Sequence, residues 1–169
     1  DTRTIQNGPR NGESVPVETP TTIHSVLSFE SGAIITLLAS WDVWASNHPL
    51  MELYGTKGTM NLPDPNFFGG TLTVTQNSSD PIEKSWDHPF NVANFEETQA
   101  NYRGAGLADM ALAIAQGRPH RCNDEFATHV VEVMTAIIKA GETSSVMTMT
   151  TTCSRPDVLG PEKARALML

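Results

Sequence analysis

The sequence predicts an α+β fold: an open, mostly antiparallel β-sheet with helices packed on one face and the other face free for a subunit or domain interface. Apolar and polar residues alternate with the period of a β-strand through Thr21–Phe29 and Ala33–Trp44. Turns marked by glycine separate these segments from further short strands. Two segments with helical periodicity follow, one ending at Gly117 and one running from Asn123 to Gly141.

Length and charge narrow the possible functions. The chain has 169 residues, the length of one domain, and a formal net charge of −8. This sign disfavours binding to nucleic acid or to an anionic membrane, because both need clustered lysine and arginine. No apolar run reaches the roughly 18 residues of a membrane helix. The only cysteines, Cys122 and Cys153, match neither a disulfide framework nor a zinc site, so we expect reduced thiols and a cytoplasmic protein.

Composition divides the chain into three parts. Residues 1–20 are rich in glycine and proline and predict an extended N-terminal arm, with the alternative that Val15–Glu18 pairs with a sheet edge. Residues 21–152 predict the α+β domain itself. Residues 153–169 predict a C-terminal tail of the same domain, with one helical turn near Pro161–Leu167.

The loop between the two long strands decides which side chains share a face. A three-residue loop, Glu30-Ser31-Gly32 with Gly32 left-handed, would pair Phe29 with Ala33. One face is then uniformly apolar: Ile23, Leu27, Phe29, Ala33, Ile35, Leu37, Ala39, Trp41 and Val43. The other, called the mixed face below, carries Thr22, His24, Val26, Ser28, Ile34, Thr36, Leu38, Ser40 and Asp42. A surface of this mixture is typical of contact with a second subunit, a second domain or a ligand.

The remaining elements follow from shorter patterns. A hairpin is predicted from Met51–Tyr54 and Thr59–Leu62, then a strand at Thr71–Thr75, an irregular stretch at Asn77–Gln99 and a late strand at Val146–Met149. The hairpin turn, Gly55-Thr56-Lys57-Gly58, lacks the continuation of a phosphate-binding loop, so we interpret it as a turn.

Two apolar stripes predict the helices that cover the apolar sheet face. They are Leu107, Met110, Ala111 and Ile114 on the first helix, and Phe126, Val130, Met134 and Ile137 on the second. Asn123 is the predicted N-cap of the second helix.

An ordered set of short motifs runs through the chain. It comprises Leu27, Phe29, Ser31-Gly32-Ala33, Glu52-Leu53-Tyr54-Gly55-Thr56-Lys57-Gly58-Thr59, Asp109, Ala113-Ile114, Gly117-Arg118-Pro119, Ala127, His129, Glu132-Val133-Met134 and Ala136-Ile137. From about Thr21 to Thr151 the chain thereby resembles the C-terminal domain of the glucose–fructose oxidoreductase/inositol dehydrogenase (Gfo/Idh/MocA) family.

The resemblance implies an intact protein whose N-terminal Rossmann domain binds NAD or NADP, and whose C-terminal domain completes the substrate cleft and carries the subunit interface. Family members oxidise or reduce a sugar, a polyol or a related compound. The present sequence lacks a Gly-x-Gly-x-x-Gly fingerprint after a strand, and also the family's Glu-Lys-Pro and Asp-x-x-x-His segments. We therefore expect an isolated C-terminal domain with no catalytic and no cofactor-binding residues, inactive by itself.

Four residues are candidates for substrate binding. Trp44 and His48 lie where the second long strand rises into a loop, a region that approaches the substrate in the resembling family. His88 and Arg103, beside the irregular stretch, could reach the same cleft. An aromatic platform with carboxylate or imidazole hydrogen bonds suits a carbohydrate. For each of the four, packing or a solvated loop position is the alternative.

Other polar and aromatic residues have structural interpretations. Trp41 is interpreted as a packing residue. Asp109 is interpreted as a carboxylate that stabilises the dipole of the helix whose start it follows. Glu125, His129 and Glu132 share a helix face, but no motif supplies a further ligand, so we predict a structural histidine and no metal site.

Together these observations favour the C-terminal substrate-binding and oligomerisation domain of an NAD(P)-dependent oxidoreductase, assembled as a homo-oligomer through the mixed face. The alternative is a free-standing protein-interaction or small-molecule-sensing module with the same fold. An upstream reading frame without a Rossmann-coding segment would favour the interaction module. An intact protein that bound sugar without reducing a nicotinamide would favour the sensor.

Overall fold

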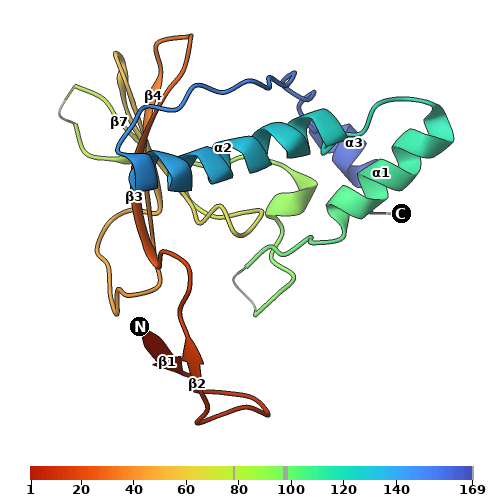
Figure 1. The fold of residues 1–169 in the computed structure, drawn as a ribbon. Helices are drawn as coiled ribbons and strands as arrows, with labels where there is room; N and C mark the ends of the chain where they lie inside the picture. The colour runs from red at the N-terminus through yellow and green to blue at the C-terminus, as the bar shows by residue number, and fades with distance from the viewer. Residues whose placement is uncertain (78, 97–98, 169) are drawn as a thin grey trace. The chain divides into compact units, whose positions relative to one another are not determined.

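A computed structural model describes residues 1–77, 79–96 and 99–168 (Figure 1). The strands are β1 (Thr2–Thr4), β2 (Ser14–Pro16), β3 (Thr22–Ser28), β4 (Ile34–Ser40), β5 (Met51–Gly55), β6 (Gly58–Leu62), β7 (Leu72–Thr75) and β8 (Ile82–Lys84). The helices are the 3-10 turn η1 (Pro89–Asn91), α1 (Ala105–Gln116), α2 (Asp124–Thr143) and α3 (Pro161–Ala166). The predicted α+β class with open antiparallel sheets is confirmed. Among the described residues the strands form three sheets, β1-β2, β3-β4 and β5-β6-β7-β8, rather than one.

The chain folds into two compact units that interleave in sequence. The first unit contains Asp1–Ser46 and His129–Thr151, and the second contains Asn47–Thr128 and Thr152–Leu169. Each unit is therefore built from two stretches of chain that lie far apart in the sequence. The sequence pattern did not indicate this division.

The N-terminal segment of the first unit is a small hairpin. The predicted arm at residues 1–20 is extended, but β1 and β2 pair with each other, with Arg3 opposite Val15. The alternative, in which Val15–Glu18 joins the edge of another sheet, is wrong. Glycine and proline here mark the turn between two strands instead of preventing strands.

The β3–β4 hairpin has the predicted register. The Phe29 amide donates to the Ala33 carbonyl (3.0 Å), and the Gly32 amide donates to the Phe29 carbonyl (2.9 Å). Gly32 has a φ of 85°, the left-handed conformation that a three-residue loop requires. His24 lies opposite Leu38, and Leu27 opposite Ile35. The predicted assignment of side chains to faces along these paired residues is confirmed, but Ser25, opposite Leu37, also lies on the apolar face, which is therefore not uniformly apolar.

The two faces of this hairpin differ in exposure along β3. The mixed-face residues Thr22, His24, Val26 and Ser28 are exposed, whereas Ile23, Ser25 and Leu27 on the apolar face are half-buried. On β4 both faces stay open: Leu38 on the mixed face is 48% exposed and Leu37 on the apolar face 39%. The mixed face is thus left free by the chain's own described elements, and its contact with a second subunit or domain stays a prediction. The apolar face is only partly covered, in a unit that also contains α2 from His129 onward.

β4 ends earlier than the alternation predicts. The strand stops at Ser40, whose hydroxyl accepts a hydrogen bond from the Asp42 amide (3.0 Å). The Asp42 carboxylate accepts hydrogen bonds from the Thr21 and Thr22 hydroxyls at 2.6 and 2.7 Å. These side-chain bonds turn the chain away from the sheet. Trp41 is consequently 84% exposed, and its interpretation as a packing residue is wrong.

The sheet of the second unit also has two unlike faces. The predicted hairpin is present, with Gly55 paired to Gly58 and Met51 paired to Leu62. The register places Met51, Leu53, Met60, Leu62, Leu72, Val74 and Ile82 on one face, and Glu52, Tyr54, Thr59, Asn61, Thr73, Thr75 and Glu83 on the other. Strand β8 was not predicted; it lies in the stretch that we expected to be irregular.

The ends of α1 and α2 agree with the sequence signals. Gly117 adopts the left-handed conformation (φ 64°) at the C-terminus of α1, and its amide donates to carbonyls of the last turn. The Asn123 side chain accepts a hydrogen bond from the Phe126 amide (2.8 Å), which confirms it as the N-cap of α2. The predicted turn near Pro161–Leu167 is α3.

The buried faces of α1 and α2 differ from the predicted stripes. On α1, Leu107 and Ile114 are 73% and 75% exposed, while Asp109 and Ala113 are buried. On α2, Val130 and Met134 are exposed, whereas the half-buried residues are Phe126, His129, Glu132, Val133, Ala136, Ile137, Ile138 and Ala140. Hydrophobicity alone misplaced the buried face of α1, whereas on α2 it was right for Phe126 and Ile137 and wrong for Val130 and Met134. On each helix a carboxylate makes the contacts described below.

Two further observations complete the fold. The predicted strand at Val146–Met149 is wrong: these residues pair with no other strand among those described. None of the described helices is both long enough and apolar enough to cross a lipid bilayer.

Candidate functional site

The four predicted substrate-binding residues are divided between the two units. Trp44 follows β4 in the first unit, whereas His48, His88 and Arg103 belong to the second. Trp44 is fully exposed, with a relative surface of 102%, and His48 is also exposed. A role of these residues in substrate binding stays a prediction.

His88 has both ring nitrogens engaged. Its Nε2 lies 2.9 Å from the Leu159 carbonyl, and its Nδ1 accepts a hydrogen bond from the Phe90 amide (3.2 Å). A nitrogen that accepts carries no proton, so the ring is the neutral Nε2–H tautomer that donates to Leu159. The ring also lies 5.7 Å from Trp86 and 5.6 Å from Phe90. In this arrangement His88 caps η1 and joins it to the C-terminal segment.

Arg103 holds the loop that follows β6. Its Nη2 donates to the backbone and side-chain oxygens of Asn66, both at 2.8 Å. The guanidinium lies 6.0 Å from the centre of the Phe67 ring, within reach of a cation–π interaction. Arg103 therefore positions residues 66 and 67.

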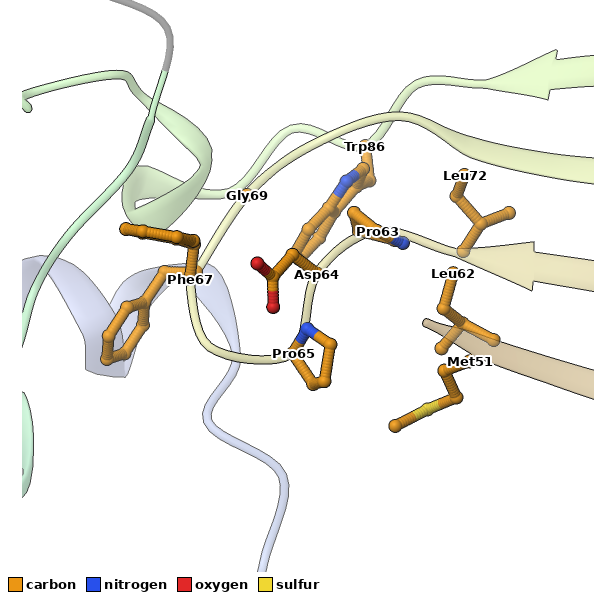
Figure 2. Close-up of a pocket in the computed structure, with 10 residues that line it drawn as sticks. Met51, Leu62, Pro63, Asp64, Pro65, Phe67, Gly69, Leu72 and Trp86 are labelled. Carbon is orange, nitrogen blue, oxygen red and sulfur yellow. The ribbon is translucent and has the colours of Figure 1, made fainter. Parts of the chain in front are cut away.

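A pocket is lined by two of the residues that Arg103 and His88 contact, Phe67 and Trp86. It is a hollow of about 230 Å³ lined by Met51, Leu62, Pro63, Asp64, Pro65, Phe67, Phe68, Gly69, Leu72 and Trp86. Figure 2 shows Met51, Leu62 and Leu72 at the ends of strands and Pro63, Asp64 and Pro65 on the loop that continues β6. Arg103 contacts the lining residue Phe67, and the His88 ring lies beside the lining residue Trp86 at an interplanar angle of 31°.

Sequence reasoning missed this pocket. Pro63-Asp64-Pro65-Asn66 and Gly69-Gly70 indicated only the bounds of a loop. The useful signal was the pair Phe67-Phe68 inside a loop rich in proline and glycine, because two aromatic residues in such a segment need an apolar surface to contact. Phe68 contacts the rings of Phe90 and Tyr102, at 5.6 and 5.9 Å.

Asp109 is the one buried charged residue among those described, at 4% exposure. Its carboxylate accepts hydrogen bonds from the Arg118 Nη2 (2.9 Å), the Arg121 amide (2.9 Å) and the Arg121 guanidinium. Burial alone would raise the pKa of Asp109, but the hydrogen bonds and the two arginine charges outweigh burial and lower the pKa below its usual value. The interpretation of Asp109 as a helix-dipole residue is wrong: it joins α1 to the loop that precedes α2.

Glu132 makes a comparable connection in the first unit. Its carboxylate accepts hydrogen bonds from the Thr150 amide and hydroxyl (2.8 and 2.6 Å), the Thr151 amide (2.8 Å) and the Thr151 hydroxyl. The hydrogen bonds from Thr150 and Thr151 lower the pKa of Glu132 to about 2. The amides of residues 150 and 151 thus bond to a side chain, where the sequence pattern predicted a strand nearby.

His129 belongs to the same network. Its Nδ1 lies 2.9 Å from the Thr151 hydroxyl, which gives its own proton to Glu132, so Nδ1 carries a hydrogen and donates. This geometry supports the structural interpretation of His129. No three or more His, Cys, Asp or Glu side chains lie close enough to hold a metal ion in the described parts of the chain.

The described residues do not fit a dinucleotide. Every strand pair recorded for them is antiparallel. A dinucleotide-binding unit instead has parallel strands and a glycine-rich turn that opens a helix toward the pyrophosphate. α1 does begin beside Gly104 and Gly106, but it follows an irregular segment, not a strand.

Removing the charge of Asp109 should destabilise the second unit. We expect Asp109→Asn to lower the free energy of unfolding by about 3 kcal/mol, because two arginines then lose a buried anionic partner. Denaturant unfolding measured against Asp87→Asn, an exposed carboxylate in the same unit, provides the comparison. Equal stability of the two variants would show that Asp109 is not a structural connector.

The Glu132 carboxylate should make stability depend on pH in a defined window. Because its pKa is lowered from 4.5 to about 2 in the folded chain, its contribution is complete above pH 4.5 and is lost as the pH falls toward 2. Glu132→Gln should remove this part of the pH dependence, measured by unfolding between these pH values. Glu142→Gln, an exposed position near the end of the same helix, should keep it.

Comparison with known proteins gives one match. A family model described as the GFO/IDH/MocA C-terminal domain covers residues 1–61. No curated protein and no solved structure matches the chain. The matched segment contains β1 to β5 and most of β6, including the β3–β4 hairpin and its mixed face. Proteins with this domain are typically NAD(P)-dependent sugar oxidoreductases. The resemblance inferred from the sequence is thus confirmed over residues 1–61, the segment that matches the GFO/IDH/MocA C-terminal domain.

Proposed function

We propose that this chain is the substrate-binding and oligomerising C-terminal domain of an NAD(P)-dependent oxidoreductase that acts on a sugar, a polyol or a related compound. The observation that carries the proposal is the family match over residues 1–61. The antiparallel strand pairs support this division of roles, because a Rossmann domain that binds a dinucleotide is built on parallel strands. The nicotinamide cofactor would then be bound by another domain of the intact protein, and the present chain would be inactive alone.

The exposed mixed face supports the oligomerising part of the proposal. Val26 and Ile34 are 67% and 70% exposed, and Leu38 is 48% exposed. In the register of the hairpin the pair of Val26 with Thr36 lies between the pair that contains Ile34 and the pair that contains Leu38. Thr22 and Ser40 share a hydroxyl–hydroxyl hydrogen bond of 2.7 Å at one end of this face. Apolar side chains framed by hydroxyl groups are typical of subunit interfaces, in which an apolar centre is surrounded by a polar rim. A second copy of the chain is the proposed partner.

The activity is tested on the full-length protein with NAD and NADP separately, over a panel of sugars and polyols. Reduction of one nicotinamide by at least one substrate is the expected result. The same exposed mixed face also favours the second candidate, a free-standing interaction or sensing module. Substrate binding without nicotinamide reduction would support that module, and a reading frame without any Rossmann-coding segment would overturn the oxidoreductase.

A charge on the mixed face should separate the subunits. We expect Leu38→Asp to convert an oligomer into monomers at tens of micromolar, because an unpaired charge buried in an interface is strongly destabilising. Sedimentation velocity measures the change. Thr56→Asp, in the exposed turn between β5 and β6, is the matched control and should leave the oligomer intact. A wild-type protein that sediments only as a monomer would overturn the proposed interface.

A further inference from the structure

The pocket of the second unit has a composition that selects a class of ligand. We propose that it binds a small molecule in which a flat apolar group carries a positively charged amine. This site is separate from the substrate-binding role argued above, and it does not depend on the oxidoreductase proposal.

The walls of the pocket are almost entirely apolar. Three lining residues extend from the apolar face of the β5–β8 sheet: Met51, Leu62 and Leu72. Trp86 stands at the edge of the pocket with 42% of its surface exposed, and Met51 is 38% exposed. These side chains are therefore accessible to a ligand, and an indole ring offers both an apolar surface and a π face that attracts cations.

Asp64 is the one charged residue that lines the pocket. One carboxylate oxygen, Oδ1, accepts a hydrogen bond from the Asn66 amide (2.8 Å). No lysine, arginine or histidine of the described residues forms an ion pair with Asp64. In Figure 2 its carboxylate lies between the Phe67 and Trp86 side chains. The negative charge is thus left without a cation in an apolar setting, where a cationic ligand would be its natural partner.

The nearest basic residues are directed elsewhere or lie outside the lining. Arg103 donates to Asn66 and stacks over Phe67. Lys84 lies opposite Leu72 on the same sheet face, but it is exposed and does not line the pocket. An anionic ligand would have to displace one of these arrangements and would meet Asp64. The overall charge of −8 also favours the approach of a cation.

The loop that forms one wall is held in place before any ligand arrives. The Phe68 amide donates to the Ala100 carbonyl (2.8 Å), and the Gly70 amide donates to the Asn91 side chain (3.1 Å). A Cβ on Gly69 would lie 2.5 Å from the Asn91 Oδ1, so the two segments approach as closely as glycine permits. A pocket formed without rearrangement avoids the free-energy cost of ordering a loop on binding.

The same composition argues against a sugar in this pocket. A polyol needs several hydrogen-bond partners, and an unpaired hydroxyl buried against an apolar wall is costly. Asp64 is the single charged side chain here, and the other lining residues are aliphatic, aromatic, proline or glycine. One carboxylate satisfies one ammonium or N–H group. A ring with a single amine therefore matches the pocket better than a polyhydroxylated compound.

Three probes with the same ring and different charge test the proposal on the protein: phenethylamine, 2-phenylethanol and phenylacetate. Binding in the millimolar range is followed by ¹H–¹⁵N chemical-shift perturbation, which locates the site as well as the affinity. We expect phenethylamine to bind roughly three- to tenfold more tightly than 2-phenylethanol, and phenylacetate to bind most weakly. The perturbed signals should be those of residues 62–72 and 86.

Two variants separate the roles of charge and apolar contact. Asp64→Asn keeps an oxygen that can accept from the Asn66 amide, so the loop should persist, and the preference for the amine over the alcohol should disappear. Asp80→Asn, an exposed carboxylate outside the pocket, should keep that preference. Trp86→Leu should weaken the binding of all three probes, because all three share the ring that contacts the indole.

Each alternative outcome decides against the proposal. Binding of phenylacetate as tight as that of phenethylamine would overturn the charge selection. Shifts located elsewhere, or no binding of any probe, would overturn the site itself. These results come from the wild-type protein, so they stand even if a variant fails to fold, and they leave the oxidoreductase proposal unaffected because no sugar or nicotinamide is involved.

Discussion

The period of two along a β-strand is the constraint on which the rest of this structure depends. Once the loop through Gly32 sets Phe29 opposite Ala33, every side chain of β3 and β4 is assigned to a face. The turn between Gly55 and Gly58 does the same for the second sheet. Each sheet consequently has an apolar face and a face that contains polar groups. The proposed subunit interface lies on the mixed face of one sheet, and the pocket lies at the end of the apolar face of the other.

Carboxylates on helices supply connections that apolar packing does not. Asp109 of α1 bonds to Arg118 and Arg121, which follow that helix, and Glu132 of α2 bonds to residues 150 and 151, after the end of α2. In both cases a segment that pairs with no described strand is held by a side-chain carboxylate. The carboxylate accepts hydrogen bonds from backbone amides that the carbonyls of a neighbouring strand would accept in a β-sheet. The helices therefore orient toward their carboxylates, and leucine, isoleucine and methionine side chains are left exposed.

The competition between apolar packing and carboxylate hydrogen bonds for the orientation of each helix explains how far the sequence could predict the fold. The positions of β3, β5, β6 and β7, the Gly32 loop, the Asn123 N-cap and the end of α1 at Gly117 follow from local patterns, and the structure has them. The stripe from Leu107 to Ile114 was wrongly predicted to be the buried face of α1. Hydrophobic periodicity detects apolar side chains only and gives no signal for a buried ion pair such as that of Asp109. The predicted site residues were chosen by chemical type; of these, His88 and Arg103 turn out to support pocket walls that only the folded loop creates.

The interleaving of the two units has a consequence for how the chain is made. The first unit joins Asp1–Ser46 to His129–Thr151, so its two parts are separated by more than the entire β5–β8 sheet. During synthesis the N-terminal hairpins leave the ribosome long before the segment that completes their unit exists. Bringing the two parts together closes a long loop, which costs conformational entropy. Contacts between residues so far apart in the sequence also form slowly during folding. Until that segment is synthesised, the apolar side chains of the nascent hairpins stay exposed to solvent. A chaperone that binds exposed apolar segments would therefore act on the chain at this stage.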